Sequence, residues 1–266
     1  MIGIIGGGFG LYGWLPALCQ YYPNEKILLE SRHKEKFDKR PELQQYKDRI
    51  EWLYYTEIIM QSELLVLAIP PYCVYEYLDL LLYHNSVKKL IVEKPVCETP
   101  EKSEDFIKQI EAKGIKICSS YLFIYTDWFK KLDKNEQYHI IWNKPNTNPL
   151  NSWKHYPKSG GGKIFYLIHL LAVSTYFKKM VVDVTNKPYS IYNRSNIISQ
   201  IEDFTIISKD KIFKISHPFP KSENGEDNRI PYLLQLLDDF ENNYEKVNTL
   251  MKQTNQLWKK EQLKLN

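Results

Sequence analysis

Short apolar runs alternate with longer stretches of helical periodicity over residues 1 to about 120. We interpret the apolar runs as buried strands, at Ile2–Ile5, Ile27–Leu29, Trp52–Tyr55, Leu64–Ile69, Leu90–Val92 and Ile115–Cys118. Parallel strands need crossover connections, so strands that alternate with helices predict an α/β fold with a doubly wound parallel sheet.

The segments between these strands are predicted as helices, at Leu15–Tyr21, Val74–Tyr83 and residues 100–113. The third has signals at both ends. Thr99 supplies a side-chain oxygen at the N-cap and Pro100 occupies the first helical position. Gly114 ends the helix.

Residues beyond 120 follow a different pattern. Period-two alternation predicts strands, at Tyr138–Trp142, Met180–Val184, Ser190–Tyr192, Ile197–Ile201, Phe204–Ile207 and Ile212–Ile215. A hairpin turn is expected at Ser208–Lys211, a buried helix at Lys163–Phe177 and one long helix over Tyr232–Lys264. The chain therefore divides into a first domain at 1–120 and a second at 121–266.

Composition and charge argue against several classes of protein. The chain has 36 basic and 32 acidic residues, spread along its length, whereas nucleic-acid binding needs a clustered basic face. No apolar run approaches the roughly 20 residues of a membrane span, and the N-terminus lacks a signal-peptide pattern. The 4 cysteines lack the paired spacing of a zinc site. We therefore expect a cytoplasmic protein with reduced thiols and no metal.

A glycine-rich turn follows the first strand and is expected to hold a dinucleotide. One register, Gly6-Gly7-Gly8-Phe9-Gly10-Leu11, begins at the end of the strand but has leucine in place of the third small residue. A second register, Gly8 to Gly13, matches GxGxxG fully but begins two residues late. We favour the first, because a glycine at the strand end makes the tight turn and lets N–H groups approach a pyrophosphate.

The end of the second strand bears on the choice of cofactor. Ser31 and Arg32 provide a hydroxyl and a guanidinium, which suit the 2′-phosphate of NADP. Glu30 is an acid of the kind that holds the ribose hydroxyls of NAD. The sequence favours NADP and leaves NAD open.

Several motifs together resemble the Gfo/Idh/MocA family of oxidoreductases. The motifs are the glycine turn with Leu15-Pro16-Ala17-Leu18, then Leu67-Ala68-Ile69-Pro70-Pro71, Val92-Glu93-Lys94-Pro95-Val96, and Lys113-Gly114-Ile115 leading to Ser120-Tyr121. The resemblance implies a Rossmann domain followed by an α+β domain with an open, mostly antiparallel sheet. It also implies NAD or NADP as hydride carrier, with Ile69, Pro70 and Glu93 beside the cofactor, and a homo-oligomer, either a dimer or a tetramer.

Two residues that match the family's catalytic set are Lys94 and His169. Ser159-Gly160-Gly161-Gly162 resembles the family's glycine-rich entry to a helix, which carries an aspartate and, four residues later, a histidine that faces the nicotinamide. His169 matches the histidine, whereas Phe165 stands in place of the aspartate. Tyr166 is the nearest group that could replace the acid, because a phenol can relay a proton.

We expect Lys94 to act as the general acid/base, since burial can lower the pKa of a lysine toward neutrality. His169 would orient the substrate or share the proton. The substrate would also contact an aromatic wall, formed by Tyr121, Trp142, Trp153 and Tyr156.

Three functions remain open from the sequence. The first is an NAD(P)-dependent oxidoreductase that acts on a sugar, a nucleotide-linked sugar or a similar polyol. The second is an imine reductase or another small-molecule reductase on the same scaffold, which the missing acid at Phe165 makes plausible. The third is a regulatory protein that binds the dinucleotide without chemistry.

Overall fold

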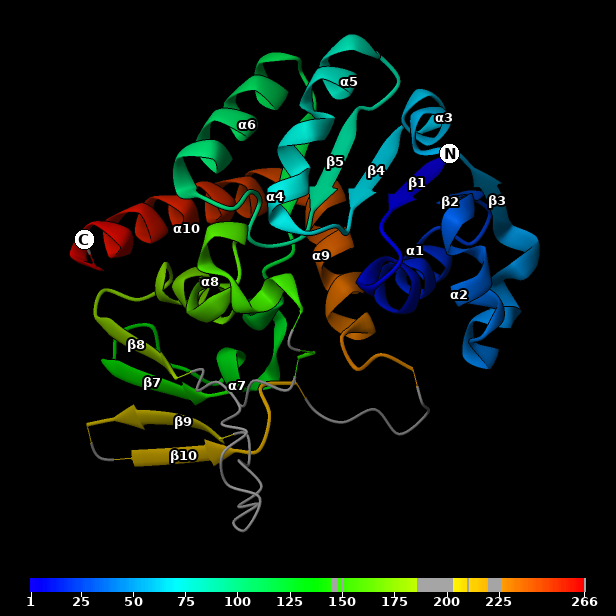
Figure 1. Cartoon of the computed structure of the whole chain (residues 1–266). Helices are drawn as coiled ribbons and strands as arrows, with labels where there is room; N and C mark the ends of the chain where they lie inside the picture. Colours follow the sequence, from blue (N-terminus) through cyan, green and yellow to red (C-terminus); the bar gives the residue numbers. More distant parts are fainter. Residues whose placement is uncertain (145–147, 150, 186–202, 210, 220–225, 266) are drawn as a thin grey trace.

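A six-stranded parallel sheet forms the core of the first half of the molecule. The structure is a computed structural model that describes residues 1–144, 148–149, 151–185, 203–209, 211–219 and 226–265. The strand order is β3-β2-β1-β4-β5-β6 (Figure 1). The strands are β1 (Ile2–Ile5), β2 (Ile27–Glu30), β3 (Ile50–Leu53), β4 (Leu64–Leu67), β5 (Lys89–Val92) and β6 (Lys116–Ser119). Because helices cover both faces, β1, β2 and β4 are buried along their whole length.

This strand order defines where a ligand can bind. β1 pairs with β2 on one side and with β4 on the other, so the chain changes direction across the sheet between β1 and β4. Ligands of open α/β sheets bind at this switch point, beyond the carboxyl ends of the strands. The doubly wound parallel sheet predicted from the apolar runs is confirmed.

Helices of the first half connect these strands. They are α1 (Leu15–Tyr21), α2 (Lys34–Asp38), α3 (Tyr55–Gln61), α4 (Pro71–Val74), α5 (Leu78–Tyr83) and α6 (Pro100–Ala112). The Thr99 side chain accepts a hydrogen bond from the N–H of Lys102, at 3.2 Å, which confirms the predicted cap of α6. The third strand was placed too late by the sequence pattern. Tyr54 instead caps α3, whose Glu57 side chain accepts the Tyr54 N–H at 2.9 Å.

The second half contains a four-stranded sheet in the order β10-β9-β7-β8 (Figure 1). Its strands are β7 (Tyr138–Asn143), β8 (Met180–Thr185), β9 (Asp203–Ser208) and β10 (Lys211–Ile215). β9 is antiparallel to both neighbours, and β7 and β8 are parallel. Among the described strands the sheet is therefore open and mostly antiparallel, as predicted. The strands expected at Ser190–Tyr192 and Ile197–Ile201 lie outside the described residues.

The remaining helices join the two halves. They are α7 (Asp127–Lys130), α8 (Gly162–Ser174), α9 (Ile230–Asn242) and α10 (Tyr244–Leu265). The single C-terminal helix predicted from periodicity is wrong: it is interrupted at Asn243, whose φ of −136° and ψ of 44° leave the helical region. α9 packs on α1, and α10 packs on α6, β6 and α8 (Figure 1). The end of the chain thus returns to the first sheet, and residues just before α9 reach the glycine turn.

Within the described ranges, no helix combines the length and the apolarity needed to cross a membrane. The same part of the chain holds no group of three or more metal-ligating side chains.

Candidate functional site

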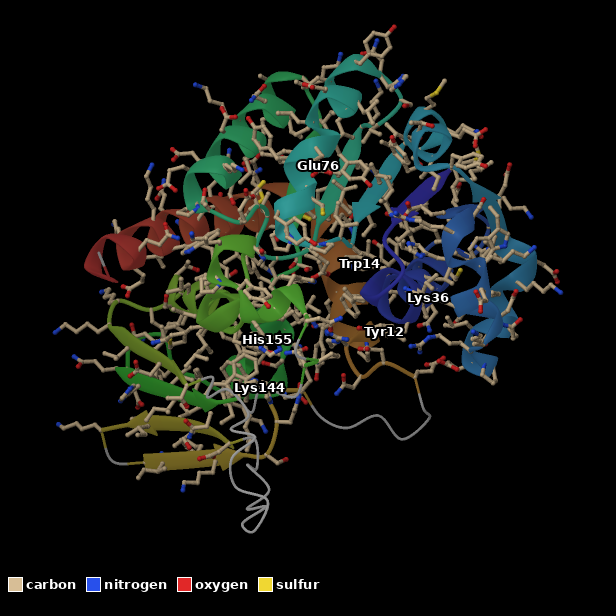
Figure 2. The ribbon with its side chains drawn as sticks, in the orientation of Figure 1. Tyr12, Trp14, Lys36, Glu76, Lys144 and His155 are labelled. Atoms are coloured by element: carbon tan, nitrogen blue, oxygen red, sulfur yellow. The ribbon has the colours of Figure 1, made fainter. Side chains whose placement is uncertain are left out.

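A cavity of about 780 Å³ lies between the two halves, at the carboxyl ends of the first sheet. The residues that follow β1, β4, β5 and β6 all line it: Gly6–Gly8, Ala68–Pro70, Glu93 and Lys94, and Ser120. Figure 2 shows Tyr12 and Lys36 of the first half on one side of it and Lys144 of the second half on the other. Its volume falls within the range of roughly 300–1,000 Å³ of ligand pockets.

The glycine turn forms the wall of the cavity at β1. Gly6 has a φ of +126°, and a Cβ there would lie 2.1 Å from the carbonyl oxygen of Ala68, so only glycine fits the turn. A Cβ at Gly8 would meet nothing within 4 Å, which leaves open space above the backbone. Gly8 is followed by Phe9, whose side chain also lines the cavity.

Gly10 supplies the close packing that the third glycine of GxGxxG usually gives. A Cβ at Gly10 would lie 3.0 Å from Cγ2 of Ile4 and 3.4 Å from the Cβ of Ala68. Leu11 is buried in the core. Neither Gly10 nor Leu11 lines the cavity. Gly6 and Gly8 of the first register thus line the cavity, and the close packing on β1 and β4 occurs at Gly10, one residue before Leu11.

Basic side chains line the cavity next to β2. Arg32, His33 and Lys36 all face it, whereas Ser31 donates its hydroxyl to the carbonyl of Leu53, at 3.2 Å, and does not line it. Glu30 is 3% exposed and turned inward, where its carboxylate accepts the Gly6 N–H at 2.9 Å.

Glu30 also pairs with its two basic neighbours. Its oxygens lie 2.6 Å from Nη2 of Arg32 and 3.2 Å from Nε2 of His33. Burial alone would raise the pKa of Glu30, but His33, Arg32 and the Gly6 N–H together lower it below its usual value. The carboxylate is therefore ionised and fully engaged with protein groups.

Lys94 extends from the end of β5 across the cavity to α8. Its side chain is 7% exposed, and Nζ donates a hydrogen bond to the carbonyl of Phe165 at 2.8 Å. Nζ also lies 3.5 Å from the centre of the Phe165 ring. Burial, together with the charges of Lys154 and Arg229, holds the pKa of Lys94 well below its usual value, against the opposing charge of Glu93. Lys94 is thus biased toward the neutral amine.

Glu93 is held by the first half of the molecule. Nε1 of Trp14 donates to its Oε1 at 2.8 Å. Glu93 is the only acidic residue among the described residues that line the cavity. Its negative charge therefore faces the cations of the opposite wall.

His169 lies one turn of α8 beyond Phe165, in the same wall. Its ring stacks on Phe123, with centroids 4.5 Å apart and planes inclined by 16°. Nδ1 is buried and has no hydrogen-bond partner among the described residues. Burial, assisted by the charges of Lys94 and Arg229, holds the pKa of His169 well below its usual value, so the imidazole is neutral at pH 7.

The buried neutral His169 makes a prediction about acid stability. In the unfolded chain the imidazole gains a proton below about pH 6.5, whereas the folded protein excludes it. The free energy of unfolding should therefore fall by about 1.4 kcal/mol per pH unit below pH 6.5 through this group. His169→Phe keeps the stacking on Phe123 and should remove that contribution. Denaturant titrations of both proteins from pH 7.5 to pH 5 measure it, and identical slopes would contradict it.

Aromatic residues form part of the wall around Lys94. Trp153 packs on the edge of Phe165, with centroids 5.3 Å apart, and Trp142 packs on Tyr166 at 5.4 Å. Trp142, Trp153, Phe165 and Tyr166 all line the cavity. The Tyr166 hydroxyl accepts a hydrogen bond from Nδ2 of Asn148 at 3.2 Å.

Two members of the predicted aromatic wall are placed elsewhere. Tyr121 is buried in the core and Tyr156 is 53% exposed, and neither lines the cavity. Ser120, which precedes Tyr121, faces the cavity instead, and its hydroxyl is buried without a hydrogen-bond partner in the described structure.

Arg229, which immediately precedes α9, was missed by the sequence interpretation. Its guanidinium stacks over the ring of Phe9, 3.9 Å from the centroid. Asp227 accepts from its Nε at 2.8 Å and from its Nη2 at 2.7 Å. No spacing rule links residue 229 to the glycine turn, because only the docking of α9 on α1 brings them together.

Comparison with known proteins gives a match in structure alone. No protein-family model matches the chain, and no curated protein matches it. A 3-ketoreductase from Actinomadura kijaniata, in complex with NADP and TDP-benzene, is 11% identical with a TM-score of 0.65 over 96% of this chain and 94% of that one. The WlbA dehydrogenase from Thermus thermophilus, in complex with NAD and UDP-GlcNAcA, is 9% identical with a TM-score of 0.64 over 96% and 92%.

A regulatory protein has the same fold. A super-repressor mutant of Gal80p from Saccharomyces cerevisiae is 12% identical, with a TM-score of 0.63 over 92% of this chain and 87% of that one. The dehydrogenases among these structures are of the Gfo/Idh/MocA type, so the fold implied by the sequence resemblance is confirmed. At these identities the likeness concerns the fold alone.

Proposed function

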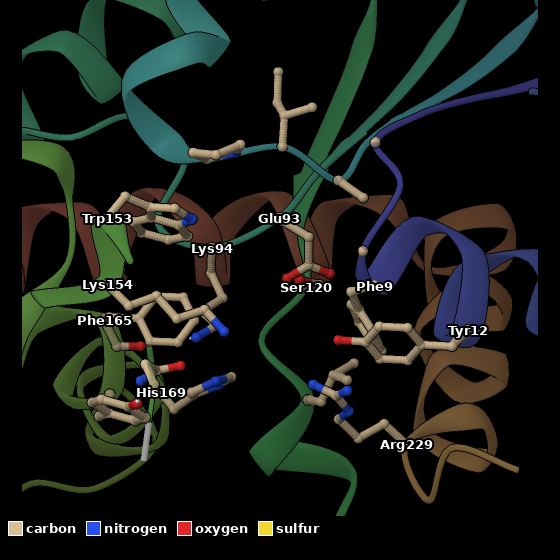
Figure 3. A pocket seen from close by; sticks show the side chains of 18 of the residues that line it. Phe9, Tyr12, Glu93, Lys94, Ser120, Trp153, Lys154, Phe165, His169 and Arg229 are labelled. Atoms are coloured by element: carbon tan, nitrogen blue, oxygen red, sulfur yellow. Dashed lines mark hydrogen bonds between the residues drawn. The ribbon is translucent and has the colours of Figure 1, made fainter. Parts of the chain in front are cut away.

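We propose that this protein is an NADP-dependent oxidoreductase that transfers a hydride between the nicotinamide and a sugar-type substrate. The observation that carries the proposal is the placement of Lys94 and His169 in one cavity, opposite the glycine turn (Figure 3). The reductase and the dehydrogenase with the same fold, which bind NADP or NAD with nucleotide-sugar-type ligands, support the substrate class.

The residues of the cavity fit a dinucleotide. The open space above Gly8, which a Cβ would enter without contact, suits a pyrophosphate on the main-chain N–H groups of the turn. The unpartnered hydroxyl of Ser120 lies in the same cavity, between the turn and Lys94 (Figure 3). It provides a hydrogen-bonding group at the inner end of the cavity, where a carboxamide needs one.

The environment of Glu30 supports NADP over NAD. An acid at the end of β2 favours NAD when it accepts the ribose hydroxyls, but this carboxylate already accepts the Gly6 N–H and does not line the cavity. Arg32, with 63% of its side chain exposed, and Lys36 are the two cations that line the cavity there, together with His33. Two cations suit a 2′-phosphate.

Arg32→Gln should therefore weaken NADPH binding about tenfold to a hundredfold and leave NADH binding nearly unchanged, because only NADPH carries the phosphate that the guanidinium would contact. Fluorescence titration of both nucleotides measures the two dissociation constants. Lys39→Gln, which alters an exposed ion pair with Glu35, is the matched control. Equal losses for NADPH and NADH would show that Arg32 does not select the cofactor.

The chain's own residues can move the proton that accompanies the hydride. The bound nicotinamide would supply or accept the hydride. In the direction of alcohol oxidation the neutral Lys94 amine accepts the proton of the substrate hydroxyl, and in carbonyl reduction its ammonium form returns it. His169, a neutral imidazole one helical turn beyond Phe165, would hydrogen-bond the substrate oxygen and orient the reacting carbon.

A turnover screen tests the proposal. Purified protein with NADPH or NADP⁺ should turn over at least one sugar, polyol or nucleotide-linked sugar in a panel that pairs each carbonyl compound with its alcohol. Imine substrates in the same panel separate a C=N reductase from a C=O reductase. NADPH binding with no turnover across the panel would refute the enzymatic proposal.

A non-catalytic regulator is the second candidate. Phe165 stands where the family's catalytic set has an acid, and the Gal80p super-repressor shares the fold. In this case Lys94 and His169 would shape a nucleotide pocket, and NADPH would bind tightly without any reaction.

A further inference from the structure

We propose that the substrate of this site carries an anionic group, a carboxylate or a phosphate ester, that binds between Lys154 and Arg229. This inference rests on the oxidoreductase function proposed above and adds the class of substrate. Lys154 lies just after Trp153, in the segment that leads to α8.

Cationic side chains outnumber acidic ones in the lining of the cavity. Lys94, Lys154 and Arg229 all line it, and Glu93 is the single acid among the described residues of the lining. Glu93 accepts a hydrogen bond from Trp14 and Arg229 is paired with Asp227, so Lys154 has no ion-pair partner among the described residues. Bringing several cations together costs free energy unless a negative group joins them.

Lys154 is a cation that the fold partly buries without a negative partner among the described residues. It is about half buried, no carboxylate of the described residues pairs with it, and its Nζ lies 5.1 Å from the centre of the Phe165 ring. Burial lowers the pKa of Lys154, and the charges of Arg229 and Lys144 lower it further, against Glu93. Lys154 is therefore a partly buried cation without an ion-pair partner among the described residues.

Arg229 has a free edge on the cavity side. Asp227 occupies its Nε and Nη2, and no hydrogen bond among the described residues engages Nη1. Figure 3 shows its guanidinium pointing into the cavity from one side and the amino groups of Lys94 and Lys154 from the other. A planar anion placed between them would meet a fork of donors and an ammonium group.

The position of Lys154 separates this site from the cofactor. The cations next to β2, Arg32 and Lys36, serve the outer end of the cavity, and the glycine turn serves a pyrophosphate. Lys154 lies against Phe165, whose ring also contacts Nζ of Lys94. An anion on Lys154 would therefore belong to the molecule whose reacting carbon is next to Lys94.

Sugar acids and sugar phosphates share this chemistry, and matched ligands tell them apart. The panel pairs D-glucose with D-glucuronate and with D-glucose 6-phosphate, and extends the same pairing to other hexoses. Binding to the full chain saturated with NADP⁺ is measured by calorimetry, and turnover is measured on the same compounds.

At least one charged member should bind tenfold or more tightly than its neutral partner, and Lys154→Gln should remove most of that preference. Lys158→Gln, an exposed lysine outside the cavity, should keep it. Lys154→Gln should leave NADPH binding unchanged.

Equal binding of charged and neutral partners, or no binding of any charged member, overturns the proposal. So does a loss of NADPH affinity in Lys154→Gln as large as the loss for the anion, because the lysine would then serve the cofactor. Tighter binding of a charged compound without any turnover would support the anion site and refute the oxidoreductase function. Turnover of neutral sugars with equal binding of charged and neutral compounds would support the oxidoreductase function and refute the anion site.

Discussion

Lys94→Met is expected to lower kcat about a thousandfold while NADPH still binds. A positioned acid or base contributes roughly 10²- to 10⁴-fold to a rate, and Lys94 is the basic side chain that contacts α8 beside His169. Methionine has a similar length and keeps the apolar contact with the Phe165 ring, so the shape of the cavity is retained. Steady-state kinetics with the best substrate of the panel measure the loss.

Two measurements on Lys94→Met test whether the loss of turnover comes from a loss of stability or from weaker binding of NADPH. The free energy of unfolding should stay equal or rise, because the substitution removes a buried amine whose protonated form is unfavourable in the fold. The dissociation constant for NADPH should stay within about threefold, since the turn that holds the pyrophosphate is untouched. Turnover within tenfold of the unmodified protein would show that Lys94 is not the acid/base.

The first sheet could be predicted because its strands are short, its central strands β1, β2 and β4 are fully buried, and strong end signals separate them. Val92 ends β5 and is followed at once by Glu93 and Lys94, which places the lysine at the carboxyl edge without any knowledge of the fold. The misplacement of β3 has a simple cause. Tyr54 and Tyr55 suit a strand by residue type, but the capping box with Glu57 begins a helix there.

The break between α9 and α10 could not be predicted from periodicity. The apolar spine continues through Phe240 and Tyr244 on both sides of Asn243, so the pattern carries no interruption. The break is a tertiary feature, since α9 packs on α1 and α10 turns to pack on α6 and β6.

The residues of the candidate site also fall into a group that the sequence could predict and a group that it could not. Residues that follow a strand directly, such as Gly6, Gly8 and Lys94, were predicted because local sequence fixes their place in a parallel sheet. Arg229 and Lys154 come from segments whose position depends on how the second half docks. An arginine before a helix or a lysine in a polar loop has no local signal of function, so the place of these two cations in the cavity emerges only from the structure.

Phe165 is the departure from the family pattern with the sharpest consequence. Its ring and its carbonyl take up the Lys94 amino group, at 3.5 Å and 2.8 Å, where the resemblance implies an aspartate. A carboxylate would stabilise the ammonium form, whereas a half-buried ring supplies no full negative charge. A carboxylate at position 165 would therefore oppose the burial and the charges of Lys154 and Arg229, which hold the pKa of Lys94 low.

Phe165→Asp should therefore raise the pKa of Lys94 by about 1 to 3 pH units, since an opposite charge this close favours the protonated form. Oxidation needs the neutral amine, so the midpoint of log kcat/KM against pH should move up by the same amount. At a pH below both midpoints the oxidation rate should fall about tenfold for each pH unit by which the midpoint rises. Phe165→Asn removes the ring without adding charge, and its midpoint should move far less. Equal midpoints for the two variants would mean that electrostatics at residue 165 does not control the protonation of Lys94.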